Sequence, residues 1–236
     1  MVMVRLQKFL SQAGVCSRRK GEAHILQGDV VVNGAVVMAL GTKIDPEIDT
    51  ILFRGERVVK ASPHIYVMLN KPQGYVSSCR HRNDKIVTQL VDVPHRLFPV
   101  GRLDKDSTGL LLLTNDGRIH HRLSHPSFDH EKEYDVTVQR PMDDQALRTM
   151  EKGMSLSGVM TRPAKVRRLS NRRFRLILKE GRNRQIRRMV KKVGNRVTRL
   201  HRTRVAGLTL GNLAQGTWRL LSQSEIQQLL TRLQIR

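Results

Sequence analysis

The sequence opens with a helical pattern of apolar and polar positions. Four apolar residues fall at i, i+3, i+4 and i+7 and would share one helix face: Leu6, Phe9, Leu10 and Ala13. This spacing predicts a helix over Arg5–Ala13. Ser17 is a typical N-cap residue, so a second helix is expected over Arg18–Gln27. Its inward-facing residues are expected to be Ala23, Ile25 and Leu26.

Short strand-like runs follow these two helices. Val30–Val32 and Val36–Val37 flank an Asn-Gly pair, which suits the type I′ turn of a β-hairpin. Two further runs flank another glycine turn, at Ile51–Phe53 and Arg57–Val59. Two helices followed by short strands within about sixty residues lie near the lower size limit of an independent domain. We therefore expect a small N-terminal α/β domain over residues 1–60.

The rest of the chain alternates between strand and helix patterns. The strand-like runs are Ile65–Leu69, Leu110–Thr114, Tyr134–Val138, Phe174–Leu178 and Val197–Leu200. The helical patterns are Arg118–Leu123, Asp143–Met150, Arg184–Val193 and Ser224–Leu233. This mixed order predicts an α+β fold whose second domain, over residues 64–236, has a mixed and largely antiparallel sheet. The polar stretch Lys60–Pro63 is the expected linker.

The charge of the chain indicates what kind of partner it binds. The chain has 43 Lys and Arg against 20 Asp and Glu, which gives a net charge of +23. Such an excess has no structural use, because like charges repel one another in a compact state. RNA or DNA is the simplest polyanionic partner. A membrane surface would require a basic amphipathic helix or a lipid anchor, and neither is found, so no membrane association is expected.

Cofactor and compartment signals are weak by comparison. Cys16 and Cys79 lack a metal-type spacing, which excludes a zinc ribbon and indicates reduced thiols in a cytoplasmic protein. No signal peptide or transmembrane run is evident. Four histidines form a loose group that is interpreted as surface residues and not as a metal site: His120, His121, His125 and His130. With no Walker-type loop and no GxGxxG pattern, no cofactor is expected.

The densest chemical signal is the segment from Val100 to Gly117, VGRLDKDSTGLLLLTNDG. Two glycines bracket a polar loop, and an apolar strand follows it. A carboxylate on a loop that is fixed by a buried strand is well placed for catalysis. Asp104 and Asp106 are both candidates, and both are equally open to interpretation as ordinary turn residues.

Two further segments carry candidate residues. Between Arg162 and Arg204 there are 18 Lys or Arg and one acid, Glu180, so most of these cations are expected to contact phosphates. Arg187 lies beside the predicted apolar face of its helix and could reach an interior cleft. Tyr134 begins a strand, where its ring could serve as core or as a stacking platform for a base.

The motifs also resemble known families. RLQKFLSQAGVCSRRKGEAHILQGDVVVNG, within Arg5–Val37, resembles an S4 RNA-binding domain. The body resembles the RsuA/RluB/RluF branch of the pseudouridine synthases through NKPQG at Asn70–Gly74, GRLDKDSTGLLLLTNDG, KEY at Lys132–Tyr134 and EGRNRQIRRM at Glu180–Met189. These four motifs occur in the family's order behind the S4-like segment. The resemblance therefore covers nearly the whole chain.

The pseudouridine synthase resemblance implies roles for four residues. Asp104 matches the essential aspartate of the second motif, which decides against Asp106. Tyr134 matches the tyrosine that stacks on the target base, and Arg187 matches the basic residue that pairs with the aspartate. Arg102 matches a residue that can occupy the gap left by a flipped base. Ser107 departs from the threonine of many members, which bears on subfamily more than on activity.

The S4 resemblance implies that Arg18, Arg19 and Lys20 contact RNA, whereas the residues alone favour a solvated helix start. Together, the two resemblances imply a cofactor-free isomerisation of uridine to pseudouridine in ribosomal RNA or a pre-ribosomal particle. The motifs look closest to the RluF and RluB types, which favours 23S over 16S rRNA. A monomer is expected. The alternative is a non-catalytic S4-type RNA-binding or ribosome-assembly factor.

Overall fold

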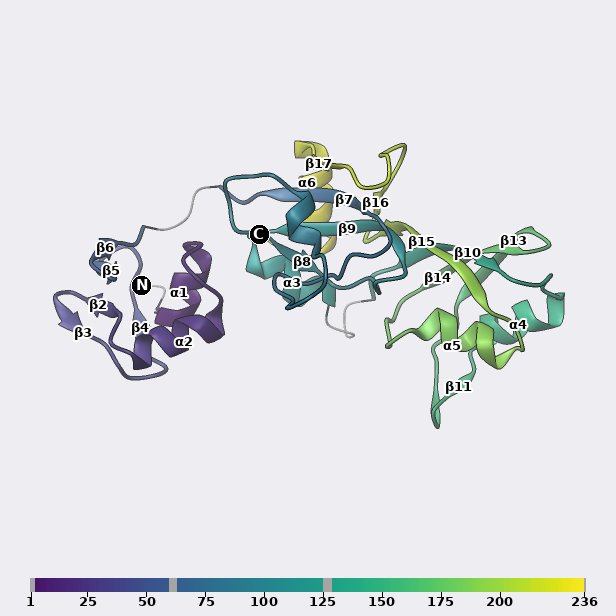
Figure 1. Ribbon diagram of the computed structural model, residues 1–236, viewed down its shortest axis with the longest axis horizontal. Helices are drawn as coiled ribbons and strands as arrows, with labels where there is room; N and C mark the ends of the chain where they lie inside the picture. The colour runs from purple at the N-terminus through teal and green to yellow at the C-terminus, as the bar shows by residue number, and fades with distance from the viewer. Residues whose placement is uncertain (1–2, 60–62, 125–128, 236) are drawn as a thin grey trace. The chain divides into compact units, whose positions relative to one another are not determined.

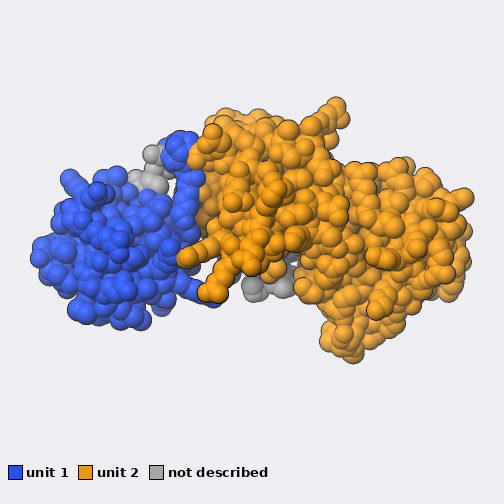
Figure 2. All heavy atoms as spheres, viewed as in Figure 1, with its two compact units in different colours: residues 1–65, 94–96 blue, residues 66–93, 97–236 orange. Residues whose placement is uncertain are grey.

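A computed structural model describes residues 3–59, 63–124 and 129–235 of the chain. Its contacts divide the chain into two compact units, coloured separately in Figure 2. The smaller unit comprises Met1–Ile65 and Pro94–Arg96, and the larger comprises Tyr66–Val93 and Leu97–Arg236. Each unit encloses an apolar core of its own.

The small unit begins with both predicted helices, α1 (Leu6–Gln12) and α2 (Arg18–Leu26). The Ser17 hydroxyl caps α2 by accepting a backbone N–H of its first turn at 3.3 Å. Ile25 is fully buried, as expected, but Leu26 is 52% exposed. Ala23 is exposed as well, so the prediction that Ala23 and Leu26 face inward is wrong. Gly21 and Ile25, about one helical turn apart, occupy the buried face, and adjacent helical residues point about 100° apart.

Short strands complete the small unit. A four-stranded sheet has the order β3-β2-β5-β6, and a separate pair joins β1 to β4. Their bounds are β1 (Val4–Arg5), β2 (Val30–Val32), β3 (Ala35–Val36), β4 (Lys43–Ile44), β5 (Ile51–Phe53) and β6 (Glu56–Arg57). Asn33 and Gly34 have φ of 51° and 85°. A type I′ turn requires positive φ at both positions, so the predicted hairpin between β2 and β3 is confirmed.

The larger unit is built on one sheet with the order β13-β14-β10-β15-β9-β7-β17, in which β8 also pairs with β9 and β16 with β15. Among the described strands, only β15 and β9 run parallel, so the predicted mixed, largely antiparallel sheet is confirmed. The strands are β7 (Tyr66–Lys71), β8 (Phe98–Val100), β9 (Thr108–Thr114), β10 (Lys132–Val138), β13 (Lys165–Ser170), β14 (Arg173–Leu178), β15 (Val197–Val205), β16 (Leu208–Thr209) and β17 (Trp218–Leu220).

Helices flank the two halves of this sheet differently. The elements are η1 (Val87–Leu90), α3 (Gly117–Ser124), α4 (Asp144–Lys152), the hairpin β11 (Ser155–Leu156) with β12 (Val159–Met160), α5 (Gln185–Lys192) and α6 (Gln223–Arg232). In Figure 1, α4 and α5 lie on the same side of the β13-β14-β10-β15 half. Leu229 of α6 shares an apolar core with Leu110 and Leu112 of β9. Within the described ranges, no helix combines the length and apolarity needed to cross a bilayer.

The parallel contact between β9 and β15 depends on Gly109. This residue has a φ of +106°, a conformation that other residues rarely adopt. A Cβ atom at this position would lie 2.3 Å from the carbonyl oxygen of Arg202 on β15. The absence of a side chain therefore allows the two strands to approach. It also fixes the point where the preceding loop enters the sheet.

Candidate active site

The loop that carries Asp104 connects β8 to β9. Its start is clamped by Ser77, whose hydroxyl donates to the Leu103 carbonyl at 2.8 Å and accepts the Leu103 N–H at 3.1 Å. Its middle is tied by the Gly74 N–H, which donates to the Lys105 carbonyl at 2.8 Å. The segment around NKPQG therefore supports the loop. The structure gives a geometric reason for these two motifs to occur together.

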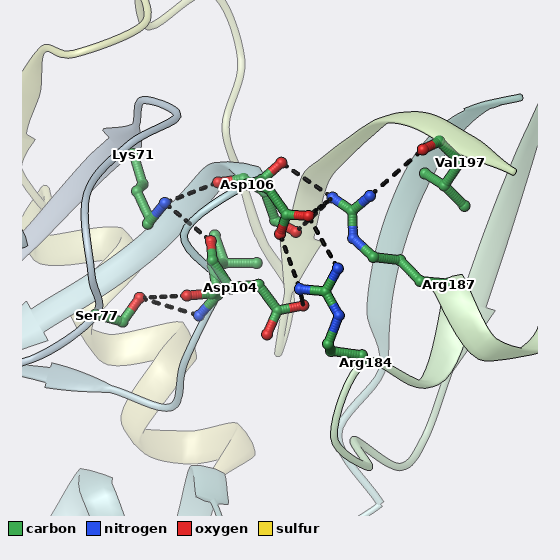
Figure 3. A network of polar contacts seen from close by, with 9 residues as sticks. Lys71, Ser77, Asp104, Asp106, Arg184, Arg187 and Val197 are labelled. Atoms are coloured by element: carbon green, nitrogen blue, oxygen red, sulfur yellow. Dashed lines mark hydrogen bonds and ion pairs between the residues drawn. The ribbon is translucent and has the colours of Figure 1, made fainter. Parts of the chain in front are cut away.

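Lys71 is the strongest of these supports. Its side chain is fully buried, and its ammonium donates to the carbonyls of Pro72 at 3.0 Å, Asp104 at 3.1 Å and Ser107 at 2.8 Å (Figure 3). Burial lowers the pKa of Lys71 to about 8, although the charges of Asp106 and Asp104 oppose the shift. One cation thus holds both ends of the Asp104 turn by bonding its backbone.

Two carboxylates project from this turn towards α5. The Asp104 and Asp106 side chains are 29% and 39% exposed, so solvent or a substrate can reach both. Arg184 contacts both, at 3.7 Å from Asp104 Oδ2 and 3.0 Å from Asp106 Oδ2 (Figure 3). Burial by itself would raise the pKa of Asp106. The hydrogen bond from Arg184 and the charges of Arg187 and Arg184 outweigh burial and hold that pKa below its ordinary value.

Arg187 joins the loop to β15. Its guanidinium donates to the carbonyl of Asp106 at 3.0 Å, to the hydroxyl of Ser107 at 3.3 Å and to the carbonyl of Val197 at 3.5 Å. Its ion pair is with Asp106, at 3.3 Å from Oδ2, and not with Asp104 as the family resemblance implied. Arg187 lies inside α5, level with the end of the loop, so it meets the backbone of residues 106 and 107 first.

Arg184 is the cation that sequence reasoning missed. It precedes the first residue of α5 in a left-handed conformation, with φ 49° and ψ 33°. This backbone conformation places it outside the helix, where its side chain extends over both carboxylates. The only sequence signal was its position three residues before Arg187, which helical spacing turns towards the same side. A left-handed arginine could not be foreseen from that spacing.

Tyr134 lies in the same region of the sheet. It is the Cα partner of Arg202 on β15, and Arg202 is in turn the partner of Gly109 on β9. The ring is largely buried, with 9% of the residue exposed. The structure thus supports a packed ring, while its use as a stacking platform stays a prediction.

The remaining predicted residues are not drawn into this cluster. Arg102 is exposed and forms no ion pair within the described chain. Arg18, Arg19 and Lys20 lie together and exposed on the first turn of α2, in the other unit. Among the described residues, no three His, Cys, Asp or Glu side chains converge as a metal site would require. His125 lies outside the described residues.

Comparisons with known proteins match both units of the chain to described families. The family profile described as RNA pseudouridylate synthase matches residues 65–192, and the S4 domain profile matches residues 4–47. The chain is 40% identical over 236 residues to an RNA pseudouridine synthase of Aquifex aeolicus, covering 97% of this chain and 94% of that protein. It is 38% identical over 225 residues to the dual-specificity RNA pseudouridine synthase RluF of Escherichia coli, covering 94% and 77% of the two chains.

Two further relatives match over nearly their full lengths. The ribosomal large subunit pseudouridine synthase B of Bacillus subtilis is 40% identical over 235 residues, which is 96% of each chain. A crystal structure of a pseudouridylate synthase superposes with a TM-score of 0.71 at 36% identity, covering 96% of this chain and 99% of the other. Both similarities extend through the small unit and the sheet alike.

Proposed function

The chain belongs to the RNA pseudouridylate synthase family, and from this premise we propose that it converts a specific uridine of 23S rRNA to pseudouridine. The S4 domain supports an RNA substrate. The Bacillus subtilis relative is named a ribosomal large subunit pseudouridine synthase, which favours 23S over 16S rRNA as the substrate. The enzyme acts as a cytoplasmic monomer on rRNA or on a pre-ribosomal particle, and it uses neither metal nor cofactor.

The reaction requires only a rearrangement within the uridine. The bond between N1 of the base and C1′ of the ribose breaks, the base turns, and a bond forms between C5 and C1′. The proton on C5 is lost and N1 gains one, so no electron or group enters from outside. Asp104 assists the cleavage as a carboxylate acting on the sugar or on the base. The Arg184 guanidinium lies 3.7 Å from Asp104 Oδ2 and places a positive charge beside that carboxylate.

The substrate base must leave its stack to reach Asp104. Extruding a nucleotide costs a few kcal/mol, least where the base is poorly paired. Stacking on Tyr134 offsets about 1–3 kcal/mol of this cost, the usual contribution of an aromatic side chain under a base. Arg102, exposed on the same loop, enters the gap that the base leaves. Arg18, Arg19 and Lys20 bind RNA elsewhere through the S4 domain.

One observation carries the proposal: a partly exposed Asp104 lies on a turn that a buried lysine clamps and two arginines face. A non-catalytic RNA-binding factor would have no use for a carboxylate held in this way. Rigid support of one acid is instead what bond cleavage requires, because a reacting group has to keep its position within a fraction of an ångström.

Pseudouridine formation in 23S and 16S rRNA transcripts, mapped by carbodiimide labelling, tests the proposal. We expect Asp104→Asn to abolish the product at every RNA concentration while RNA binding persists, because a negative charge near phosphates is removed. Asp92→Asn, an exposed aspartate of the same unit, is the matched control and should retain full activity. Unchanged activity in Asp104→Asn would overturn the mechanism, and modification of 16S rRNA alone would overturn the choice of substrate.

A further inference from the structure

Five arginines gather at the ends of three neighbouring strands in the larger unit. They are Arg140, Arg172, Arg173, Arg196 and Arg199. All five are exposed, and none of them forms an ion pair with a carboxylate in the part of the chain that the structure describes. Unpaired arginines are ordinary on a surface when scattered. Here the five lie together at one end of the sheet, where their positive charges repel one another.

Backbone pairing brings the five together. β10 lies between β14 and β15, and its Thr137 has Arg173 as Cα partner on one side and Arg199 on the other. Two strand spacings of about 4.8 Å separate these arginine Cα atoms by about 10 Å. The backbone N–H groups at the end of β10 donate to the carbonyls of Arg172 and Arg196, each at 2.9 Å. We call the five residues the arginine row.

The arginine row lies at the same end of the sheet as the Asp104 loop. β9 and β15 are parallel, with Thr108 beside His201. The residues that precede Thr108 therefore lie at the end where β15 begins. Arg187 bridges the two places, since its guanidinium donates to the carbonyls of Asp106 and Val197 (Figure 3). The row thus begins next to the candidate active site and continues across β10 to β14.

The acids near the arginine row are engaged elsewhere. Asp135 on β10 pairs with Arg175 at 2.8 Å. Asp144 pairs with Arg168 at 2.6 Å, and Asp143 caps α4 by accepting a backbone N–H. The positive charge of the row is therefore uncompensated. It adds to the general excess of the chain at one particular end of the sheet.

We propose that the arginine row binds the phosphate backbone of the RNA strand that flanks the target uridine. The inference rests on the proposed function, because it takes RNA to approach Asp104. A planar guanidinium can donate two parallel hydrogen bonds to a phosphate, and its charge persists at any physiological pH. Contacts of this kind set position and affinity without reading sequence. The row holds the RNA next to the loop while Asp104 acts on the extruded base.

The test compares two double variants that remove the same charge. Arg173→Gln/Arg199→Gln removes two cations of the row, and Arg148→Gln/Lys152→Gln removes two exposed cations of α4. Binding to a mixed-sequence RNA hairpin with single-stranded flanks is measured from 50 to 300 mM KCl, about the range where counterion release is steep. Each phosphate that is no longer neutralised should reduce the slope of log K against log salt by about 0.7–0.9.

We expect the slope of the row variant to fall by about 1.4–1.8 and the α4 variant to keep nearly all of its slope. Arg173→Lys/Arg199→Lys retains the charge and should restore the slope, which separates binding from misfolding. Equal slopes in both double variants, or failure of the lysine pair to restore binding, would overturn the proposal. A row variant that binds RNA normally but loses an acidic protein partner would also overturn it. Since the readout is binding, a wild-type protein without isomerase activity would refute the proposed function and leave this test interpretable.

Discussion

At the scale of single residues, Lys71 illustrates how charge is used to fix a backbone. A fully buried lysine is costly to keep ionised. It is retained here because its ammonium donates hydrogen bonds to three carbonyl oxygens, those of Pro72, Asp104 and Ser107. The sequence motif NKPQG gave no indication of this role, since its lysine could equally have contacted a phosphate. The contact is set by tertiary packing between β7 and the loop.

Lys71 should leave a signature in the pH dependence of stability. The folded protein holds its pKa at about 8, below the ordinary value of 10.5, so the unfolded chain binds more protons between these two pH values. The free energy of unfolding contributed by this group therefore rises with pH in that window, by up to about 1.4 kcal/mol per pH unit. Urea unfolding of wild type and Lys71→Met should show this rise in wild type only. Parallel pH profiles for the two proteins would contradict the assignment.

The two arginines at the loop should differ in what they contribute. Arg187 is 14% exposed and bonds three groups, so Arg187→Ala should destabilise the protein by about 1–3 kcal/mol and lower kcat. Arg184 is 46% exposed, and a surface ion pair contributes at most about 1 kcal/mol, so Arg184→Ala should lower kcat with little loss of stability. Thermal unfolding and single-turnover assays separate the two effects. An Arg184→Ala enzyme with wild-type kcat would exclude it from the reaction.

At the scale of elements, the link between β9 and β15 should depend on Gly109. A methyl group there meets the backbone of Arg202 at 2.3 Å, which the strands can relieve only by separating. Gly109→Ala should therefore cost more than about 3 kcal/mol, the range of severe core defects. Gly216→Ala tests the cost of a positive φ without a steric clash, because Gly216 has a φ of +85° and an added Cβ would meet no atom within 4 Å. This variant should lose about 1–2 kcal/mol of stability. Similar chemical denaturation midpoints for both variants would show that strain, and not the close approach, governs the site.

Elements with a clear period were predictable, and those without one were not. The helices α3 to α6 and the buried strands β7, β9, β10 and β14 match the patterns expected from the sequence. β13 was missed because it is an edge strand whose exposed residues include Lys165, Arg167 and Arg168, so no alternation of apolar and polar positions marks it. β8 was missed because its three residues include a proline, which normally argues against a strand. The ion pairs of Arg184 and Arg187 with the Asp104 loop could not be predicted, because they depend on how the sheet places α5 against that loop.

At the scale of the whole molecule, the chain forms two units with separate cores. The small unit has a basic first turn on α2, and the large unit has the carboxylates and the arginine row. Under the proposals above, both units contribute to RNA affinity, whereas the chemistry belongs to the larger unit alone. Truncation should therefore remove part of the affinity and leave the chemistry, provided that the larger unit folds without the smaller.

Deleting residues 1–60 is the experiment that separates them. We expect residues 64–236 to remain folded, because the sheet and its helices enclose their own apolar core. RNA affinity should fall, and the slope of log K against log salt should become shallower by about 0.7–0.9 for each phosphate that the small unit neutralises in the full chain. Turnover at saturating RNA should survive in part, since Asp104, Arg184 and Arg187 all lie in the larger unit. Circular dichroism and cooperative thermal unfolding check the fold, and an unfolded fragment would place the domain boundary elsewhere. A folded fragment with unchanged affinity would instead assign RNA binding to the larger unit alone, whose arginine row would then have to account for the whole salt dependence.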